Sequence, residues 1–374
     1  MGKDLMYLCL IGMALCLGAC STTGKTTATP QTASNTPLAK PKNVILLIGD
    51  GMGLPQITGA MYMNDNQTVF ERFKSIGFHK SHASDNLVTD SAAGATAFAS
   101  GVKTYNGAIG VNAQKESVPT LLEMAEQKQM ATGLVASSSI THATPASFIA
   151  HVYHREEKEA IALGLLNTPV DIFIGGGMDH FVRRTSDERN LVTELTAKGY
   201  QITNFVDKDI NSLDITTSKN IGYFTANGEP LPVASGRDYL IPASEKAIDF
   251  LDERSPNGFF LMIEGSQIDW GGHANDANYV VSEMHEFEKV VAAALDFAAR
   301  DKTTLVIVTG DHETGGFAVQ PGSKLNDIKV AFTTKSHTAI MIPVFADGPG
   351  AEAFRGIYDN TAIFDKIKEA LELK

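Results

Sequence analysis

A serine at the start of a run of small residues is one group in this chain that could do covalent chemistry. Ser91 follows Thr89 and Asp90, which are good N-cap residues, and precedes a run of mostly alanine, glycine and threonine that extends to Gly101. This run predicts a helix with Ser91 in its first turn, where unpaired backbone N–H groups and the helix dipole favour an anion. Ser91 is therefore either part of an ordinary helix start or a nucleophile with open space above its hydroxyl.

Acidic residues follow three apolar runs that have the composition of strands buried on both faces of a parallel sheet. The runs and the residues after them are 44–48 with Asp50, 259–263 with Glu264, and 305–310 with Asp311 and His312. In open α/β sheets, ligands bind beyond the carboxyl ends of the strands. We therefore expect these acids to converge at one edge of the sheet.

Further groups that could bind a metal lie near the second and third runs. Asp269 and His273 are four residues apart, which places both on one side of a helix or turn, and His337 lies in a later polar segment. Carboxylate with imidazole is a mixture that suits zinc, whereas all-oxygen sets suit magnesium. Singly, each residue has an ordinary explanation as a turn former or a hydrogen-bonded histidine. Together the acids would repel one another strongly unless divalent cations were bound.

Predicted helices alternate with the strands. The helical stretches are 120–129, 244–253 and 280–300, and weaker strands are 133–136, 171–174 and 342–345. This alternation predicts a three-layer α/β/α sandwich around a large, mostly parallel central sheet. We assign it to one domain, residues 43–374, in which the polar segment at about 183–242 is an irregular excursion from the sheet edge.

The N-terminal residues are predicted to direct export. Lys3 precedes an apolar run from 5 to 17 that is too short for an ordinary membrane span and ends in Leu-Gly-Ala-Cys. This pattern predicts a lipoprotein signal peptide at 1–19 and a lipidated Cys20; a plain signal peptide cut nearby is the alternative. Residues 20–42 are rich in Thr, Ser, Ala, Pro and Lys, which predicts a flexible tether. We expect a periplasmic or cell-envelope protein.

The composition limits the partners and the means of stabilisation. The net charge of −12 argues against nucleic acid as a partner, and attraction of an anionic substrate then requires local positive charge. The three cysteines stand at positions 9, 16 and 20, so the folded domain contains none. An exported domain without disulfides is held by its core and by any bound metal.

Four motifs in this order resemble the alkaline phosphatases. They are Gly-Asp-Gly-Met-Gly at 49–53, Val-Thr-Asp-Ser-Ala at 88–92, Gly-Val-Lys-Thr-Tyr-Asn-Gly at 101–107 and Thr-Gly-Asp-His-Glu-Thr-Gly-Gly at 309–316. The resemblance extends from residue 43 to about 367 and is closest to compact bacterial members with short insertions. It implies a homodimer that acts on phosphate monoesters and releases inorganic phosphate.

The resemblance also implies a mechanism. Ser91 would become transiently phosphorylated, Arg155 would bind the phosphate, and zinc-activated water would hydrolyse the phosphoserine and so release phosphate. The implied cofactors are two Zn²⁺ and one Mg²⁺ per chain. Their implied ligand sets are Asp269, His273 and His337 for one zinc; Asp50, Asp311 and His312 for the second; and Asp50, Thr144 and Glu264 for magnesium.

Two positions depart from the best-known enterobacterial members, which carry Asp and Lys where this chain has His142 and Trp270. We expect both residues to lie near the third metal and the substrate phosphate. Glu313 is expected to be at most a neighbour of the ligands, and three other histidines are expected to be structural: His151, His154 and His285. The alternatives are a phosphodiesterase or phosphomutase with the same metal core, and a non-catalytic phosphate-binding lipoprotein.

Overall fold

The structure is a computed structural model that describes residues 40–374, apart from 214 and 217. The predicted signal peptide, Cys20 and all but the last residues of the predicted tether lie outside the described residues. Within the described part of the chain, no helix combines the length and the apolar character that crossing a membrane requires.

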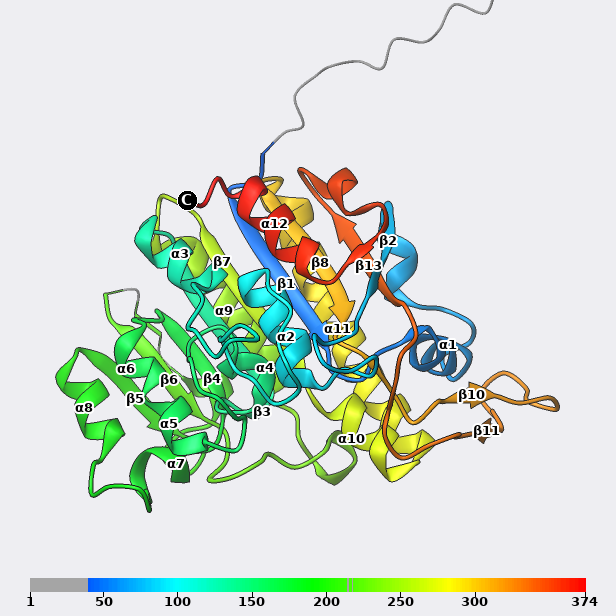
Figure 1. Cartoon of the computed structure of the whole chain (residues 1–374), viewed down its shortest axis with the longest axis horizontal. Helices are drawn as coiled ribbons and strands as arrows, with labels where there is room; N and C mark the ends of the chain where they lie inside the picture. The colour runs from blue at the N-terminus through cyan, green and yellow to red at the C-terminus, as the bar shows by residue number, and fades with distance from the viewer. Residues whose placement is uncertain (1–39, 214, 217) are drawn as a thin grey trace, which may run out of the picture. The chain divides into compact units, whose positions relative to one another are not determined.

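A ten-stranded sheet forms the centre of the fold (Figure 1). The strand order is β14-β2-β13-β8-β1-β7-β3-β4-β6-β5, and β13 is the strand of this sheet that runs antiparallel to its neighbours. The bounds are β1 Asn43–Gly49, β2 Ser75–Lys80, β3 Ala131–Ser139, β4 Ile172–Gly176, β5 Tyr200–Asn204, β6 Asn220–Phe224, β7 Phe259–Gly265, β8 Thr304–Gly310, β13 Ile342–Asp347 and β14 Gly356–Asp359. The strands predicted from apolar runs are confirmed.

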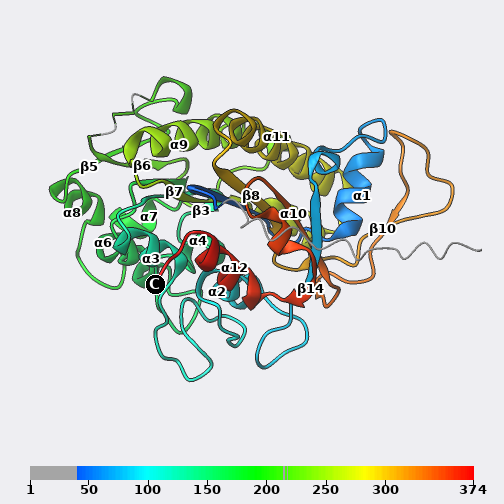
Figure 2. The same cartoon turned by 90° about the horizontal axis from the view of Figure 1, so that it is seen from above.

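Helices cover both faces of this sheet (Figure 2). On one side lie α9 (Leu240–Arg254) and α11 (Ala277–Asp301); on the other lie α2 (Ser91–Ser100), α4 (Ala143–Ala146) and α12 (Thr361–Ala370). Alternate side chains of β1 enter different cores: Leu46 packs in the cluster with α2 and α12, and Leu47 in the cluster with α9 and α11. The predicted α/β/α sandwich is confirmed, because each strand face has its own helical layer.

The remaining helices and strands are short. The helices are α1 Leu54–Tyr62, α3 Leu121–Gln127, α5 Lys158–Ala162, α6 Gly164–Asn167, α7 Asp179–Val182, α8 Leu191–Ala197 and α10 Gln267–Ala274, with 3-10 turns η1 Val69–Arg72, η2 Ile210–Ser212, η3 Val233–Ser235 and η4 Ala351–Phe354. The short strands are β9 Glu313–Thr314, β10 Ala318–Val319, β11 Val330–Ala331 and β12 His337–Thr338.

The segment 183–242 is more regular than its polar composition indicates. It contains α8 and the strands β5 and β6, which lie at one edge of the sheet. Four of the five residues of β5 are only partly buried, as is common for an edge strand, and this exposure allows polar side chains in the strand. The sequence pattern therefore lacked the continuous apolar run that identified the central strands.

The three strands that precede the acids are neighbours at the centre of the sheet. β1 pairs in parallel with β7 on one side and β8 on the other, and Gly49 lies opposite both Gly265 and Gly310. The carboxyl ends of the three strands therefore lie at one level, and the residues that follow them emerge together.

Candidate metal centre and nucleophile

Ser91 lies in the first turn of a helix that is buried along its whole length. Asp90 is the N-cap, and its Oδ1 accepts a hydrogen bond from the Ala93 N–H at 3.0 Å. Small residues let α2 approach the sheet closely: a Cβ on Gly94 would lie 3.2 Å from the Cβ of Asp311. This approach brings Ser91 Oγ to 3.4 Å from Asp50 Oδ1 and 3.3 Å from His312 Nε2.

Asp50, Asp311 and His312, which we call the inner set, are fully buried, and their ligand atoms lie within 4.8 Å of one another. His312 Nε2 is 3.5 Å from Asp50 Oδ1 and 3.2 Å from Asp311 Oδ2. Asp311 Oδ1 accepts hydrogen bonds from two backbone N–H groups, whereas Asp311 Oδ2 and Asp50 Oδ2 have no hydrogen-bond partner. Buried carboxylate oxygens without partners are costly, and a divalent cation would satisfy them.

Asp269, His273 and His337, which we call the outer set, lie on α10 and β12. Asp269 Oδ2 is 3.2 Å from His273 Nε2, and Asp269 Oδ1 is 3.5 Å from His337 Nε2. The Nδ1 atoms of the two histidines lie 2.6 and 2.8 Å from the carbonyl oxygens of Lys335 and Thr89. A proton on each Nδ1 would donate to these carbonyls and leave both Nε2 lone pairs directed toward the acid, the arrangement that metal-binding histidines use.

A third set brings the fully buried Asp50 and Glu264 together with the partly buried His142. Glu264 Oε2 accepts hydrogen bonds from Ser266 at 2.6 Å and Ser138 at 3.2 Å, while Glu264 Oε1 has no partner. The sequence predicted Thr144 here, and its Oγ1 is also buried without a partner. Ser138 and Ser266 were not predicted, although Ser138 lies in the polar end of β3 and Ser266 immediately follows β7.

The electrostatics of the two main sets differ. Burial raises the pKa of Asp50 and raises that of Asp311 to about 7, and neighbouring carboxylates add to both effects. Burial also raises the pKa of Asp269, but the hydrogen bond with His273 and the nearby histidines outweigh it, so this pKa is lowered. The partnership with Asp269 raises the pKa of His273 to about 9. Without a bound cation, the raised pKa values favour the protonated forms of the inner carboxyl groups. A divalent cation would instead stabilise their charged forms, so the donor atoms of this set fit such an ion.

Arg155 joins the nucleophile and the outer set in one cavity of about 670 Å³. Its Nη1 donates to Asp90 Oδ2 at 3.2 Å, and its Nη2 lies 3.4 Å from His142 Nε2. The His142 ring meets the Trp270 ring edge-on at a centroid distance of 6.0 Å. Arg155 is thus oriented by Asp90, the residue before the nucleophile, and lies next to His142, whose ring in turn contacts Trp270.

Glu313 connects several segments around the site through hydrogen bonds. The sequence did not predict this connecting role. Its Oε1 accepts from Gln56 Nε2 at 2.7 Å and the Phe317 N–H at 3.0 Å. Its Oε2 accepts from the Gly316 N–H at 3.2 Å and from the hydroxyl of Thr338, the neighbour of His337. Among the described residues, the three ligand sets do not include His151, His154 or His285; His151 Nδ1 lies 2.6 Å from the Gly110 carbonyl oxygen and His285 Nε2 lies 3.0 Å from that of Ala60.

The chain is similar to known phosphatases over most of its length. A family model for alkaline phosphatase matches residues 41–330. The chain is 35% identical to alkaline phosphatase 3 of Bacillus subtilis, covering 88% of this chain and 89% of the relative. It superposes on the alkaline phosphatase of the Antarctic bacterium TAB5 with a TM-score of 0.84 at 42% identity, covering 90% of this chain and 99% of that one.

A structure of a TAB5 variant with aspartate in place of a histidine is also similar, with a TM-score of 0.84, 43% identity and the same coverage, and it is described with magnesium bound in its M3 site. The fold, the ligand sets and these matches together define a metal-binding hydrolase of phosphate esters. The chain belongs to the alkaline phosphatase family.

Proposed function

We propose that this chain hydrolyses phosphate monoesters in two steps, with Ser91 as the nucleophile. The observation that carries the proposal is the position of Ser91 Oγ, within 3.4 Å of two inner-set residues and in the same cavity as Arg155 and the outer set. In the first step Ser91 Oγ bonds to phosphorus as the ester P–O bond breaks and the alcohol leaves. In the second step water attacks phosphorus, phosphate leaves and Ser91 is restored.

Arg155 holds the phosphoryl group during both steps. Its guanidinium presents a fork of N–H donors that matches two phosphoryl oxygens. Asp90 orients this fork through its contact with Nη1, and the first turn of α2 adds the positive end of a helix dipole beside Ser91. Arg155 and the start of α2 therefore favour the negative charge of the phosphoryl group.

The three ligand sets support two Zn²⁺ and one Mg²⁺, with Thr144 as a further magnesium ligand. When bound, these ions lower the pKa of the Ser91 hydroxyl and of the attacking water and offset charge in the transition state. Three divalent ions carry six positive charges against four carboxylates, Asp50, Glu264, Asp269 and Asp311. The excess of two, with Arg155, attracts an anionic substrate to an otherwise acidic protein.

Replacement of the nucleophile tests this mechanism. Ser91→Ala is expected to lower kcat by several orders of magnitude while metal content stays unchanged, and the remaining groups should leave a small residual rate. Acid quenching with labelled substrate should place the label on the peptide that contains Ser91. Label on another peptide would overturn the assignment.

Release of p-nitrophenol separates the alternatives. We expect the wild-type enzyme to act on p-nitrophenyl phosphate far faster than on bis(p-nitrophenyl) phosphate. The reverse preference would indicate a phosphodiesterase, and no turnover of either would indicate a phosphate-binding lipoprotein.

We also propose that the chain is an exported lipoprotein of the periplasm or cell envelope and forms a homodimer. The sequence pattern at Leu17 to Cys20 supports lipidation, and family resemblance supports the dimer. Cys20→Ser should release the protein from the membrane fraction with its specific activity intact. A variant that still fractionates with membranes would show that Cys20 carries no anchor.

A further inference from the structure

The last residues of β3 leave the regular pairing of the sheet where the strand approaches the third ligand set. The register of β3 with β7 ends opposite Glu264, and the register with β4 is irregular between Val135 and Ser139. Ser137 and Ser138 have no partner in either register, although this end of the strand is buried. Buried backbone groups need hydrogen-bond partners, so side chains from other segments must hold this end of β3.

Glu229, in the loop that follows β6, provides such partners. Although Glu229 lies at the surface, its Oε2 accepts a hydrogen bond from the Ser139 N–H at 2.5 Å and its Oε1 accepts one from the Ser139 hydroxyl at 2.8 Å. Hydrogen bonds to a charged acceptor are stronger than neutral ones, and two to one residue fix its orientation. The preceding residue, Ser138, donates from its hydroxyl to Glu264 Oε2 at 3.2 Å. Glu229 therefore acts on Glu264 through two adjacent serines.

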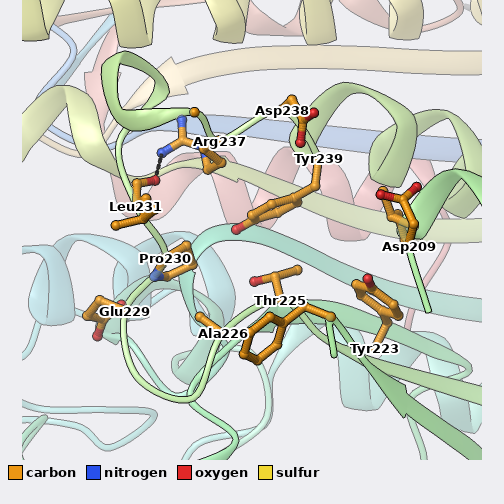
Figure 3. Close-up of a pocket in the computed structure, with 13 residues that line it drawn as sticks. Asp209, Tyr223, Thr225, Ala226, Glu229, Pro230, Leu231, Arg237, Asp238 and Tyr239 are labelled. Atoms are coloured by element: carbon orange, nitrogen blue, oxygen red, sulfur yellow. Dashed lines mark hydrogen bonds between the residues drawn. The ribbon is translucent and has the colours of Figure 1, made fainter. Parts of the chain in front are cut away.

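The loop that carries Glu229 is itself anchored to buried groups. Figure 3 shows Glu229 and Leu231 on this loop, with Arg237 Nη1 donating to the Leu231 carbonyl at 3.2 Å. The Arg237 guanidinium also contacts two buried carboxylates of α11, those of Glu283 and Glu286. Separating buried charges from their partners is costly. The loop, and with it Glu229, is therefore held in place against the end of β3.

A second line of contacts runs from the same loop to the other hydroxyl that donates to Glu264. The Pro230 carbonyl accepts from Gln267 Nε2 at 3.0 Å, and this amide also donates to the Ser137 carbonyl at 2.9 Å. The Ser137 hydroxyl accepts from the Ser266 N–H at 2.8 Å, and the Ser266 hydroxyl donates to Glu264 Oε2 at 2.6 Å. Both hydroxyls that hold Glu264 Oε2 are thus connected to this loop by hydrogen bonds.

We propose that Glu229 is a positioning residue for the third metal ion. It fixes Ser139 and so holds the Ser138 hydroxyl against Glu264 Oε2, which leaves Glu264 Oε1, a buried atom without a partner, directed to the ion. Members of such a network strengthen one another, so the effect of Glu229 should pass through Ser138. The inference rests on the proposed function, because it takes the third set as the magnesium site.

Magnesium affinity tests this role directly. Mg²⁺ is titrated by calorimetry into enzyme loaded with two zinc ions per chain. Glu229→Gln should raise the Kd of Mg²⁺ about tenfold, as is typical when a group that orients a metal ligand is changed, while zinc content stays the same. Asp238→Asn is the matched control, because Asp238 is an exposed acid on the same loop. An unchanged Kd in the Gln variant would overturn the inference.

Two further variants separate position from charge. Glu229→Asp keeps the charge but has a shorter side chain that cannot reach both Ser139 donors, so it should also bind Mg²⁺ more weakly. Ser138→Ala removes the hydroxyl through which Glu229 acts, so adding Glu229→Gln to it should change the Kd by less than about twofold. An Asp variant equal to wild type, or the full loss in the Ser138→Ala background, would mean that Glu229 acts through its charge alone and would overturn the positioning role.

The wild-type titration distinguishes this inference from the proposed function on which it rests. If zinc-loaded wild type binds no magnesium, the proposed third ion is wrong and the inference is wrong with it. If wild type binds magnesium and the Glu229 variants bind it equally well, the magnesium site stands and the positioning role of Glu229 alone is wrong.

Discussion

The inner and outer ligand sets are built from the same side-chain types but in opposite proportions and surroundings. The inner set has two carboxylates and one histidine, all fully buried; the outer set has one carboxylate and two histidines, and the His273 side chain is 42% exposed. Charge and burial would therefore hold an ion in the inner set, whereas one carboxylate and two imidazoles beside solvent would hold an ion in the outer set. We infer that the inner ion stabilises the fold and exchanges slowly, and that the outer ion exchanges with solution.

Complete removal of metal should have the largest effect. Exhaustive dialysis against EDTA is expected to abolish activity and lower Tm together, because the buried acids then face one another at the strand ends. An ion at a thousandfold excess over its Kd stabilises by about 4 kcal/mol. Differential scanning calorimetry should show Tm recover when Zn²⁺ and Mg²⁺ are restored. Superimposable melting curves with and without EDTA would mean that the ions do not stabilise the fold.

Single substitutions should show that the inner and outer ligand sets differ in how easily lost zinc is restored. Asp311→Asn removes charge from a closed site, so the variant should lose one zinc that excess zinc does not restore. His273→Gln should lower zinc affinity as well, but millimolar zinc should recover most of the activity because solvent reaches this site. Metal content after dialysis and activity against added zinc measure both effects. Equal recovery of the two variants would contradict the proposed difference in access.

Glu313→Gln should have a smaller effect, confined to the outer set. The amide keeps the side-chain volume but places an NH₂ group among four donors, so Thr338 and the adjacent His337 should shift. Changes in groups that orient metal ligands typically cost about 10- to 100-fold in metal affinity, and we expect a loss of about 10-fold for this variant. Competition with a zinc chelator measures it, with Glu352→Gln as a surface control. Equal weakening of both zinc sites would argue for a general loss of structure.

A non-chelating phosphine reductant should have no effect at all. The chain has no cysteine after position 20, so no disulfide can form in the folded domain. Activity and Tm should match those of untreated protein, whereas EDTA changes both. A reductant-induced fall in Tm would show that something other than core and metal holds the domain.

The central part of the fold and of the site could be predicted because both follow from buried strands. The runs at 44–48, 259–263 and 305–308 are continuously apolar, and parallel pairing brings the ends of their strands to one level. The edge strand β5 escaped prediction because its partly exposed residues lack such a run, and its neighbour β6, although mostly buried, is only five residues long and contains Asn220 and Gly222. The approach of His142 to Asp50 and Glu264 depends on the turn into α4, which no spacing specifies.

The contacts of Glu313 likewise could not be predicted from the sequence. They join α1, β9 and β12, and tertiary hydrogen bonds between distant segments leave no periodic pattern. Cooperative networks of this kind are recognised only once the segments are placed.

The burial of α2 has a consequence for how the molecule opens. All ten residues of the helix, from Ser91 to Ser100, are buried among the sheet, α4 and α12. Local fluctuations expose amides where few buried contacts must break, so amides in such a helix exchange with solvent deuterium only through large-scale unfolding. We expect the amides of α2 to be among the last to exchange, well after those at the end of α10, where His273 and Ala274 are exposed. Any motion that admits substrate or releases phosphate then belongs to the His273 side of the cavity, while the serine stays still.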